Sequence, residues 1–456
     1  FTDLIGVSGA NDIGDITTAA SSTVVFNSGV HADAISQSGT VTYNGLSSLD
    51  ANLTLADGAK IIVGSDIADA AVVITSAGNV IDAGTITIEM PSQLADGNTV
   101  TLFDTNAGTV DAIYSVTDTA LFDYTATLDD TAKTVVISMA KRSTAAIASN
   151  LGVSSSVGAA LSSANTAIAT GDATALAALN VALNAGGVTA KKAAETMAVQ
   201  SDTLGGGATA SMGAGGQVNS VASSRMAMMR SGAQYAGVAS ETGFNTGGHG
   251  MSNAAWMKPF GNWMDQDKVT ENGAEIAGFT AETYGLSAGV DTEVSDNVRL
   301  GGSLSYSQSE VEGEGAGKSK IDVDSYQLTL YGDYTTAEYY IEGTLGYAMN
   351  ENDMSRSIQV ATLLRTAKGT NDSSQYMASI RAGMPIHLDN ATFITPSAGV
   401  SYTQVQSDNY TETGAGNLNL TVKPEDIESL ILNASLKVHT RIKQGKGFLI
   451  PTVHAG

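Results

Sequence analysis

The sequence contains no cysteine among its 456 residues. This absence excludes disulfide frameworks, thiolate metal sites and cysteine nucleophiles, and it suits a protein that is exported unfolded through an oxidising compartment. Histidine is scarce too, and its five positions show no spacing that would pair two metal ligands: His31, His249, His387, His439 and His454. We therefore expect neither a metal nor a cofactor.

Basic residues are the second deficit. The chain carries 22 Lys and Arg against 46 Asp and Glu, and its formal net charge is −24. Binding of nucleic acid requires clustered basic side chains that neutralise phosphates. A nucleic-acid partner is therefore excluded.

Long apolar runs are missing, although 43% of the residues are hydrophobic. No stretch approaches the ~18 consecutive apolar residues of a membrane-spanning helix. If the chain crosses a membrane, it must do so as a β-barrel. The sequence begins at Phe1 without an initiator methionine and stops at Gly456 inside an apolar run, so we expect further residues at both ends.

Catalytic and nucleotide-binding motifs are also lacking. Residues 312–319 resemble a phosphate-binding loop, but Glu312 stands where the motif requires glycine. No Gly-x-Ser-x-Gly elbow, His-Glu-x-x-His helix or Ca²⁺ loop occurs. We expect no enzyme; the rival, a barrel hydrolase, has only His439, His454 and carboxylates such as Asp426 to build on.

The charge distribution divides the chain into three regions. Residues 1–142 carry 17 acidic and 4 basic side chains, residues 143–252 carry 4 and 4, and residues 253–456 carry 25 and 14. We place the domain boundaries accordingly at 1–142, 143–253 and 254–456.

Residues 1–142 repeat short β-prone runs, such as Val24–Phe26, Lys60–Val63 and Ile86–Ile88, separated by Gly, Asn, Asp and Ser. Strands this short need neighbours stacked on them. The pattern favours a parallel β-helix, although a β-sandwich gives a similar string.

Residues 143–253 are rich in alanine and glycine and indicate a helical linker. Ala173–Leu183 and Lys191–Gln200 are expected helices, and Gly205–Gly216 is expected to be a flexible break. A narrow helix of small residues, 217–230, follows it. The residues proposed to act on this helix are Gln217, Asn219, Arg225 and Arg230.

From residue 254 onward the apolar residues recur with a period of two. Tyr284, Leu286, Ala288 and Val290 alternate with polar or small residues, and the same phase continues through about nine strands. The connections run long, short, long, short, for example 265–280, 293–297, 309–319, 335–338 and 350–374. This asymmetry is typical of outer-membrane barrels, which have even strand numbers, so we expect about twelve strands in all.

The polar face of these strands would line the barrel lumen. The lumen-facing residues singled out are Arg299, Gln327, Glu342, Arg381 and Lys437. A barrel of about twelve strands leaves room for a helix ~10 Å wide. The arginines of helix 217–230 could then pair with inward carboxylates such as Glu342 or Asp291.

Four segments resemble the translocator barrel of autotransporters, in the family's order and spacing: Ala255–Gly261, Tyr284–Asp291, Thr395–Tyr402 and Tyr410–Ala415. The resemblance covers about the last 200 residues. It implies an all-β architecture with a helical linker: the end of a β-helical passenger, a helix in the pore, and an antiparallel transmembrane barrel of which about nine strands are present.

The resemblance further implies an outer-membrane translocator that exports and anchors its own N-terminal passenger at the cell surface. Its expected partners are outer-membrane lipid, the barrel assembly machinery, periplasmic chaperones and, for an adhesive passenger, an unknown surface ligand. Some relatives cleave themselves at a linker asparagine, but Asn219 stands alone and favours an uncut passenger. A plain porin is the alternative, and it leaves the first 250 residues without a role.

Overall fold

The computed structural model describes residues 14–50, 52–64, 67–90, 96–105, 108–169, 171–199, 201–230, 244–245, 253–271, 274–389, 391–440, 442–444, 447–449 and 451–456. The chain forms two compact units, Phe1–Ala198 with Gln359–Leu364, and Val199–Ile358 with Arg365–Gly456. The units divide the chain near residue 198, whereas composition divides it at 142 and 253. Each unit is described by itself.

The first unit begins with strands stacked in parallel on three faces. One face runs β1 (Ile16–Thr18), β4 (Ile35–Gln37), β7 (Leu53–Leu55), the start of β10 (Val80–Glu89) and β12 (Val110–Val116). The second runs β2 (Thr23–Phe26), β5 (Thr40–Tyr43), β8 (Lys60–Val63) and the end of β10. The third runs β3 (His31–Ala32), β6 (Ser47–Leu49), β9 (Val72–Ser76) and β11 (Thr99–Thr105). This arrangement is a parallel β-helix, and it confirms the first of the two folds considered for this region.

The β-helix is held by side chains that stack from coil to coil. Val41, Ile61 and Ile88 occupy the same register position on successive strands and are fully buried. Burying one such side chain contributes about 1.5–3 kcal/mol. The rings of Phe26 and Tyr43 lie beside them, with centroids 5.6 Å apart and planes tilted by 40°.

The turns of the β-helix explain why asparagine and aspartate punctuate the sequence. Asn52 Oδ1 accepts a hydrogen bond of 2.8 Å from the Asn79 N–H of the next coil, and Asn79 Oδ1 accepts one of 2.9 Å from the Thr109 N–H. Asp57 Oδ1 accepts from Thr85 N–H at 3.0 Å. Backbone donors that leave the sheet at a corner are therefore satisfied by side chains of the coil below.

An antiparallel hairpin and four helices complete the first unit. β13 (Phe122–Asp129) pairs with β14 (Thr134–Lys141), which pairs with β11 in antiparallel register. The helices α1 (Thr144–Leu151), α2 (Ser155–Ala169), α3 (Ala173–Asn184) and α4 (Gly187–Thr196) follow. They pack on one another through buried side chains such as Ile147, Leu161 and Leu179. The alanine-rich segment is thus a packed helical module.

The second unit is an antiparallel half-barrel. Its sheet has the order β15 (Phe244–Asn245), β16 (Asn253–Gln266), β19 (Phe279–Ser295), β20 (Val298–Gly313), β21 (Lys320–Thr335), β22 (Tyr340–Val360), β23 (Leu363–Gly383), β25 (Thr392–Ser407), β28 (Ile427–Thr440) and β31 (Thr452–Ala455). β24 (Ile386–His387) pairs with β25. The connections carry β17 (Val269–Glu271) with β18 (Ala274–Ile276), β26 (Tyr410–Thr411) with β27 (Thr421–Val422), a 3₁₀ turn at Gly416–Leu418, and β29 (Ile442–Gln444) with β30 (Gly447–Leu449).

One expected loop is wrong. Residues 350–374 are not an irregular connection, because β22 and β23 continue through them and meet at a tight turn after Val360. The outward face of this segment is largely polar, and its inward face mixes polar side chains with apolar ones such as Ile358 and Val360, which hid the period of two. Cross-strand hydrogen bonds join buried side chains to the neighbouring strand, as from Asn352 Nδ2 to the Asn371 carbonyl at 3.1 Å.

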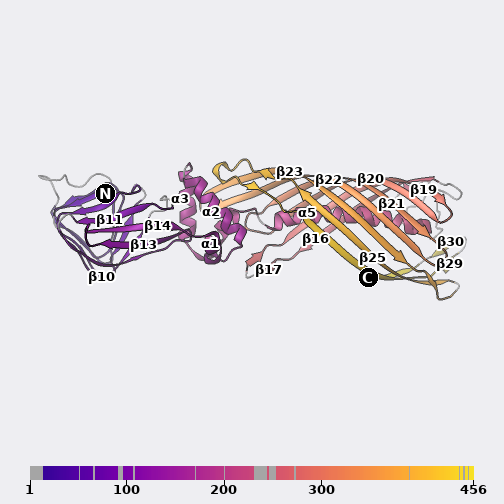
Figure 1. The fold of residues 1–456 in the computed structure, drawn as a ribbon, viewed down its shortest axis with the longest axis horizontal. Helices are drawn as coiled ribbons and strands as arrows, with labels where there is room; N and C mark the ends of the chain where they lie inside the picture. The colour runs from indigo at the N-terminus through magenta and orange to yellow at the C-terminus, as the bar shows by residue number, and fades with distance from the viewer. Residues whose placement is uncertain are drawn as a thin grey trace. The chain divides into compact units, whose positions relative to one another are not determined.

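The helix α5 (Ser201–Arg230) lies among the strands of the half-barrel (Figure 1). The expected flexible break at 205–216 is also wrong, since these glycines are helical. Glycine disfavours an isolated helix, but tertiary packing dominates helix stability in proteins. Among the described helices, none combines the length and apolarity needed to cross a membrane.

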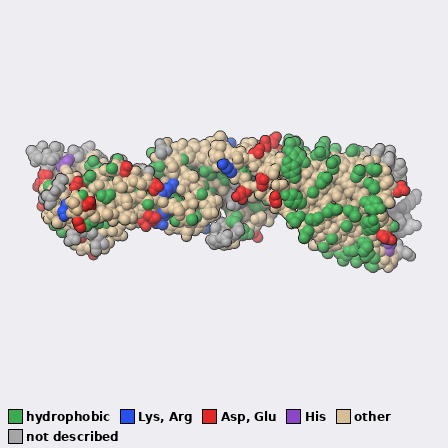
Figure 2. All heavy atoms as spheres, viewed as in Figure 1, with side chains coloured by type: hydrophobic (Ala, Val, Ile, Leu, Met, Phe, Trp, Pro, Cys, Tyr) green, Lys and Arg blue, Asp and Glu red, His purple; other side chains and the backbone are tan. Residues whose placement is uncertain are grey.

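The alternation predicted for the strands is confirmed. Leu286 and Leu304 point outward and are 43% and 68% exposed, whereas Ser287 is fully buried. Figure 2 shows hydrophobic side chains crowding the outer surface of these strands, with charged side chains mostly beyond the margins of that area. An apolar exterior with a polar interior is the arrangement of a barrel that faces lipid.

Candidate functional site

The candidate site is the contact between α5 and the inner face of the half-barrel. Four glycines of the helix lie against different strands. A Cβ added at Gly206 would lie 2.9 Å from Val311 on β20, one at Gly207 3.0 Å from Ile321 on β21, and one at Gly213 3.0 Å from Asn262 on β16. Gly215 faces β23, where a Cβ would lie 2.5 Å from Met377 Sδ. Only a helix without side chains at these points fits this closely.

Apolar contacts hold the helix at two levels. Near its N-terminal end the cluster consists of Ala210, Phe279, Ala281, Val311, Ile321, Val323, Met354 and Tyr410. Near its C-terminal end the cluster consists of Val221, Ala222, Met226, Trp256 and Tyr331. The helix is therefore fixed to the wall over most of its length.

Arg225 makes the central polar contact. Its Nε donates to Asp291 Oδ2 at 2.7 Å and its Nη2 donates to Asp291 Oδ1 at 3.0 Å. Both side chains are almost wholly buried, at 6% and 4% exposure. Tyr331 OH also donates to Asp291 at 3.2 Å and accepts from Trp256 Nε1–H at 2.7 Å. A bidentate pair with this support fixes both the rotation and the depth of the helix.

Arg230, the last residue of α5, makes a second polar contact. Its Nη2 donates to Glu342 Oε2 at 2.7 Å, its Nη1 lies 3.6 Å from Asp333 Oδ2, and its guanidinium lies 3.9 Å from the centroid of the Tyr340 ring. Asp333 and Glu342 face each other across β21 and β22. The positive charge of the arginine thus lies between two buried carboxylates and reduces the repulsion between them.

The other residues predicted for the site have varied positions. Arg381 Nη1 lies 3.5 Å from Glu342 Oε1, so it joins the Arg230 contact. Gln327 is buried and donates to Thr329 Oγ1 at 2.9 Å, and Arg299 lies 3.7 Å from Glu293 near a short turn. Lys437 is exposed on β28.

Two predicted residues lie on the helix without a polar partner in the described part of the chain. Gln217 is half-buried and has no hydrogen bond there, and the buried Oδ1 of Asn219 has no hydrogen-bond partner either.

Sequence reasoning missed Trp256, Tyr331, Asp333 and Tyr340. Tyr331 and Asp333 occupy inward positions of β21 in the same alternating phase as the predicted residues, so that phase could have found them. Nothing in the sequence indicates that the inward Trp256 would donate a hydrogen bond to Tyr331, which in turn donates one to Asp291.

The long connection between β25 and β28 is also part of the site, because its Tyr410 belongs to the apolar cluster near the N-terminal end of α5. Arg356 Nε and Nη2 donate to the two oxygens of Glu412 at 2.8 and 2.7 Å, and both side chains are buried. Leu420 N–H donates to Glu412 Oε2 at 2.8 Å. The connection is thereby folded onto β22 next to the N-terminal part of α5.

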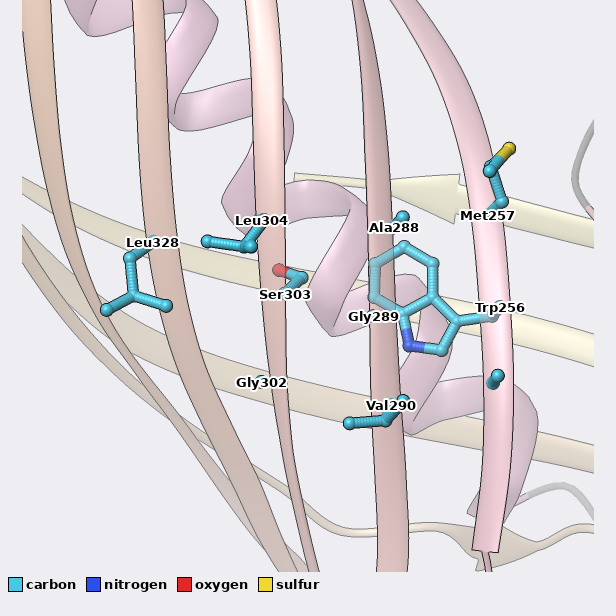
Figure 3. Close-up of a pocket in the computed structure, with 10 residues that line it drawn as sticks. Trp256, Met257, Ala288, Gly289, Val290, Gly302, Ser303, Leu304 and Leu328 are labelled. Atoms are coloured by element: carbon cyan, nitrogen blue, oxygen red, sulfur yellow. The ribbon is translucent and has the colours of Figure 1, made fainter.

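The outward face carries an apolar groove beside Trp256. Figure 3 shows the Trp256 ring beside Gly289 on the neighbouring strand, with α5 passing behind the strands. The groove is lined by Ala255, Trp256, Met257, Ala288, Gly289, Val290, Gly302, Ser303, Leu304 and Leu328. It is continuous with the exposed apolar surface, which fits a face that contacts lipid chains.

The charged groups of the site pair with one another between the helix and the wall of the half-barrel. Within the described ranges, no three His, Asp or Glu side chains gather closely enough to hold a metal ion. The arrangement can hold a helix at a defined depth and fill the interior of the half-barrel.

Comparison with known proteins agrees with this geometry. Residues 255–456 match the family model of the autotransporter beta-domain. The chain is 28% identical over 211 residues to outer membrane protein A of Rickettsia conorii, covering 44% of this chain and 10% of the relative. It is 26% identical over 201 residues to outer membrane protein B of Rickettsia prowazekii, covering 41% and 12%. The chain thus spans about a tenth of the length of these relatives.

Among solved structures, the translocator domain of the autotransporter NalP from Neisseria meningitidis aligns with 15% identity and a TM-score of 0.36, over 52% of this chain and 76% of that one. The family match begins within β16 and extends through β31, the part of the chain that forms the half-barrel. Residues 255–456 are therefore similar to an autotransporter beta-domain.

Proposed function

We propose that the half-barrel, completed to about twelve strands, is a translocator that exports the β-helix preceding it and anchors it at the cell surface. The observation that carries this proposal is α5 inside the half-barrel, locked by Arg225 to Asp291 and by Arg230 to Glu342. A helix that connects an exported segment to the barrel has to run through the pore. The residues proposed to act in this way are those of 217–230, within the longer α5.

The direction of export follows from the connections. The N-terminal end of α5 lies against Phe279 and Val311, near the long connections, and Arg230 lies near the short turn between β21 and β22. Long connections face the outside of the cell in outer-membrane barrels. The segment that precedes α5 is thereby displayed outside.

The experiment is protease accessibility in intact cells that make the full protein. Protease added outside should degrade residues 14–142, while the strands of the β-domain stay protected, and a periplasmic marker protein should remain intact. Protection of the β-helix under conditions in which other surface proteins are degraded would contradict display.

A porin-like channel is the alternative, and deletion of α5 separates the two. For a translocator, the chain without residues 201–230 should conduct ions in planar bilayers far better than the full chain and melt at a lower temperature, because the plug and its buried ion pairs are lost. For a porin, the two proteins should conduct alike.

We further propose that this chain is not an enzyme and that the barrel assembly machinery and periplasmic chaperones deliver it to the membrane. One relative, 26% identical over 165 residues, is named extracellular serine protease of Serratia marcescens. In the present chain the exported region is a β-helix whose buried residues form a packed core of stacked coils, which suits an adhesive scaffold with a ligand at the cell surface.

A further inference from the structure

One face of α5 carries small and polar residues four positions apart, Ser211, Gly215 and Asn219. Residues at this spacing lie above one another on a helix. Gly215 defines where this face points, since a Cβ there would lie 2.7 Å from Gln375 Nε2 and 2.5 Å from Met377 Sδ. The face therefore looks at the inner side of β23.

A cavity of about 370 Å³ opens beside the N-terminal part of this face, at Ser211. Its lining includes Ser211 of the helix, Asn352 and Ser373 of the wall, and Glu425 and Asp426 of the long connection before β28. Water takes up about 30 Å³ per molecule in the liquid, so the cavity has room for roughly ten molecules. It lies at the end of the half-barrel where the long connections are.

Next to the cavity, the polar side chains of β22 and β23 make only some of the hydrogen bonds that they can make. Ser373 Oγ accepts hydrogen bonds from Asn350 Nδ2 at 3.1 Å and Asn352 Nδ2 at 3.3 Å, so its own hydroxyl proton needs another acceptor. Asn350 and Gln375 are each 1% exposed, and neither Asn350 Oδ1 nor Gln375 Nε2 has a partner in the protein. An unmade hydrogen bond of a buried group costs about 1–3 kcal/mol, and ordered water commonly supplies such bonds.

Two pairs of buried hydroxyl groups on β19 and β20 bond directly to each other. Ser287 and Ser309 are as deeply buried as Ser373, at 0% and 3% exposure. Ser305 donates to Ser287 at 2.9 Å, and the hydroxyls of Thr283 and Ser309 lie 2.8 Å apart. Each of these two pairs is hydrogen-bonded within the protein, and none of the four side chains lines the cavity.

Met377 ends the row of polar inward side chains on β23. It is the next inward residue of β23 after Ser373 and Gln375, and it is 4% exposed. Its side chain lies at Gly215 of the helix and at Gly346 of β22. An apolar constriction of this kind excludes water and ions by dewetting.

We propose that a water-filled seam runs between α5 and the β22–β23 wall, from the cavity at the long-connection end down to Gln375, and that Met377 seals it. The seam admits water and small polar solutes from the outer side, and Met377 completes the barrier that the helix alone leaves open. The inference rests on the proposed plugging of the pore by α5, but its first test needs no export.

The test uses the absence of native cysteine. Ser373→Cys and the matched control Ser309→Cys are introduced separately into the full chain, folded in detergent, and treated with a small water-soluble methanethiosulfonate. The thiol at position 373 should react about tenfold faster or more, a ratio equivalent to about 1.4 kcal/mol in barrier height. Ser407→Cys, on the cavity wall, is the second variant should Ser373→Cys not fold. Equal rates at the seam and at position 309 would overturn the seam.

The seal is tested by conductance of the full chain in planar bilayers. Met377→Ser should raise the ion conductance several-fold, whereas Met377→Leu, which keeps an apolar side chain, should leave it at the level of the unchanged protein. Conductance of Met377→Ser that equals that of Met377→Leu would overturn the role of Met377. Failure of the proposed function would instead appear as loss of surface display with these reactivities unchanged.

Discussion

The β-helix and the half-barrel are both built from strands with alternating side chains, yet they bury opposite faces. In the β-helix, Ile61 is fully buried in a stack of aliphatic side chains. In the half-barrel, Ser287 is fully buried and Leu304 is 68% exposed. The difference shows that alternation fixes which residues share a face, while the surroundings decide which face is inside.

The two regions should differ most in the loss of stability when an ion pair is broken in each of them. Arg225→Ala leaves Asp291 buried without its counter-ion and should destabilise the half-barrel by about 3–5 kcal/mol. Arg142→Ala removes pairs with Asp118 and Asp123, which are 47% and 55% exposed, and should cost about 1 kcal/mol or less.

Urea unfolding measures both effects. The fluorescence of Trp256 and Trp263, the two tryptophans of the chain, reports on the half-barrel, and circular dichroism follows the rest. Restoring the pair in reverse, with Arg225→Asp and Asp291→Arg together, should recover part of the loss. An Arg225→Ala protein no less stable than Arg142→Ala would mean that the lumen is more hydrated around Asp291 than its burial indicates.

The apolar faces give the second contrast. Ile61→Ala opens a cavity between stacked coils and should cost about 2–5 kcal/mol. Leu304→Ala acts on an outward face where lipid chains replace the lost contacts, and should cost about 0.5 kcal/mol or less. Thermal melting of the protein in lipid bilayers gives both values. Similar losses would indicate that Leu304 packs against protein instead of lipid.

Two adjacent glycines of α5, Gly215 and Gly216, differ in how closely the wall of the half-barrel packs against them. Gly216 has open space around it, so Gly216→Ala should stabilise by about 0.5–1 kcal/mol through helix propensity alone. Gly215→Ala pushes a methyl group against Met377 and Gln375 and should cost about 1 kcal/mol net. The difference in melting temperature between the two variants reports the rotation of the helix, and the reverse order would place the other face against β23.

The smallest effect concerns a short turn of the half-barrel. Hydrogen bonds from the N–H groups of Ala391 and Thr392 lower the pKa of the Asp389 carboxyl. A lowered folded-state pKa contributes stability that is present above the unfolded value of about 3.9 and is lost as pH falls through the folded value. Asp389→Ala should therefore lower the urea midpoint slightly at neutral pH and not below the folded pKa. A difference that persists in acid would assign the effect to backbone geometry.

Much of the fold could be predicted because simple repeating patterns in the sequence determine it. The period of two gave the outward and inward faces of the strands, and the punctuation by Asn and Asp gave the stacked coils. Prediction failed where tertiary contacts override local signals. Gly205–Gly216 has the composition of a flexible break, but the wall of the half-barrel fits around it as a helix.

The site was predictable only in part for the same reason. The alternation of side chains along a strand identifies Asp291 and Glu342 as inward. It does not show which of the two lies at the same level along the barrel axis as Arg225. That depends on the position of the helix, which is set by glycines and by the aromatic pair Trp256 and Tyr331. Arg356 and Glu412 lie 56 residues apart, and no local pattern links them.

The antiparallel hairpin of β13 and β14 has a consequence for contacts between copies of the chain. A stack of parallel coils ends in a row of free backbone groups that could recruit the same row of a neighbouring molecule. Here β14 covers the edge of β11 in the opposite direction, and the outermost strand, β13, carries Asp123 and Asp129. On this face, a further strand approaching β13 would meet the carboxylates of Asp123 and Asp129, which disfavours edge-to-edge pairing there.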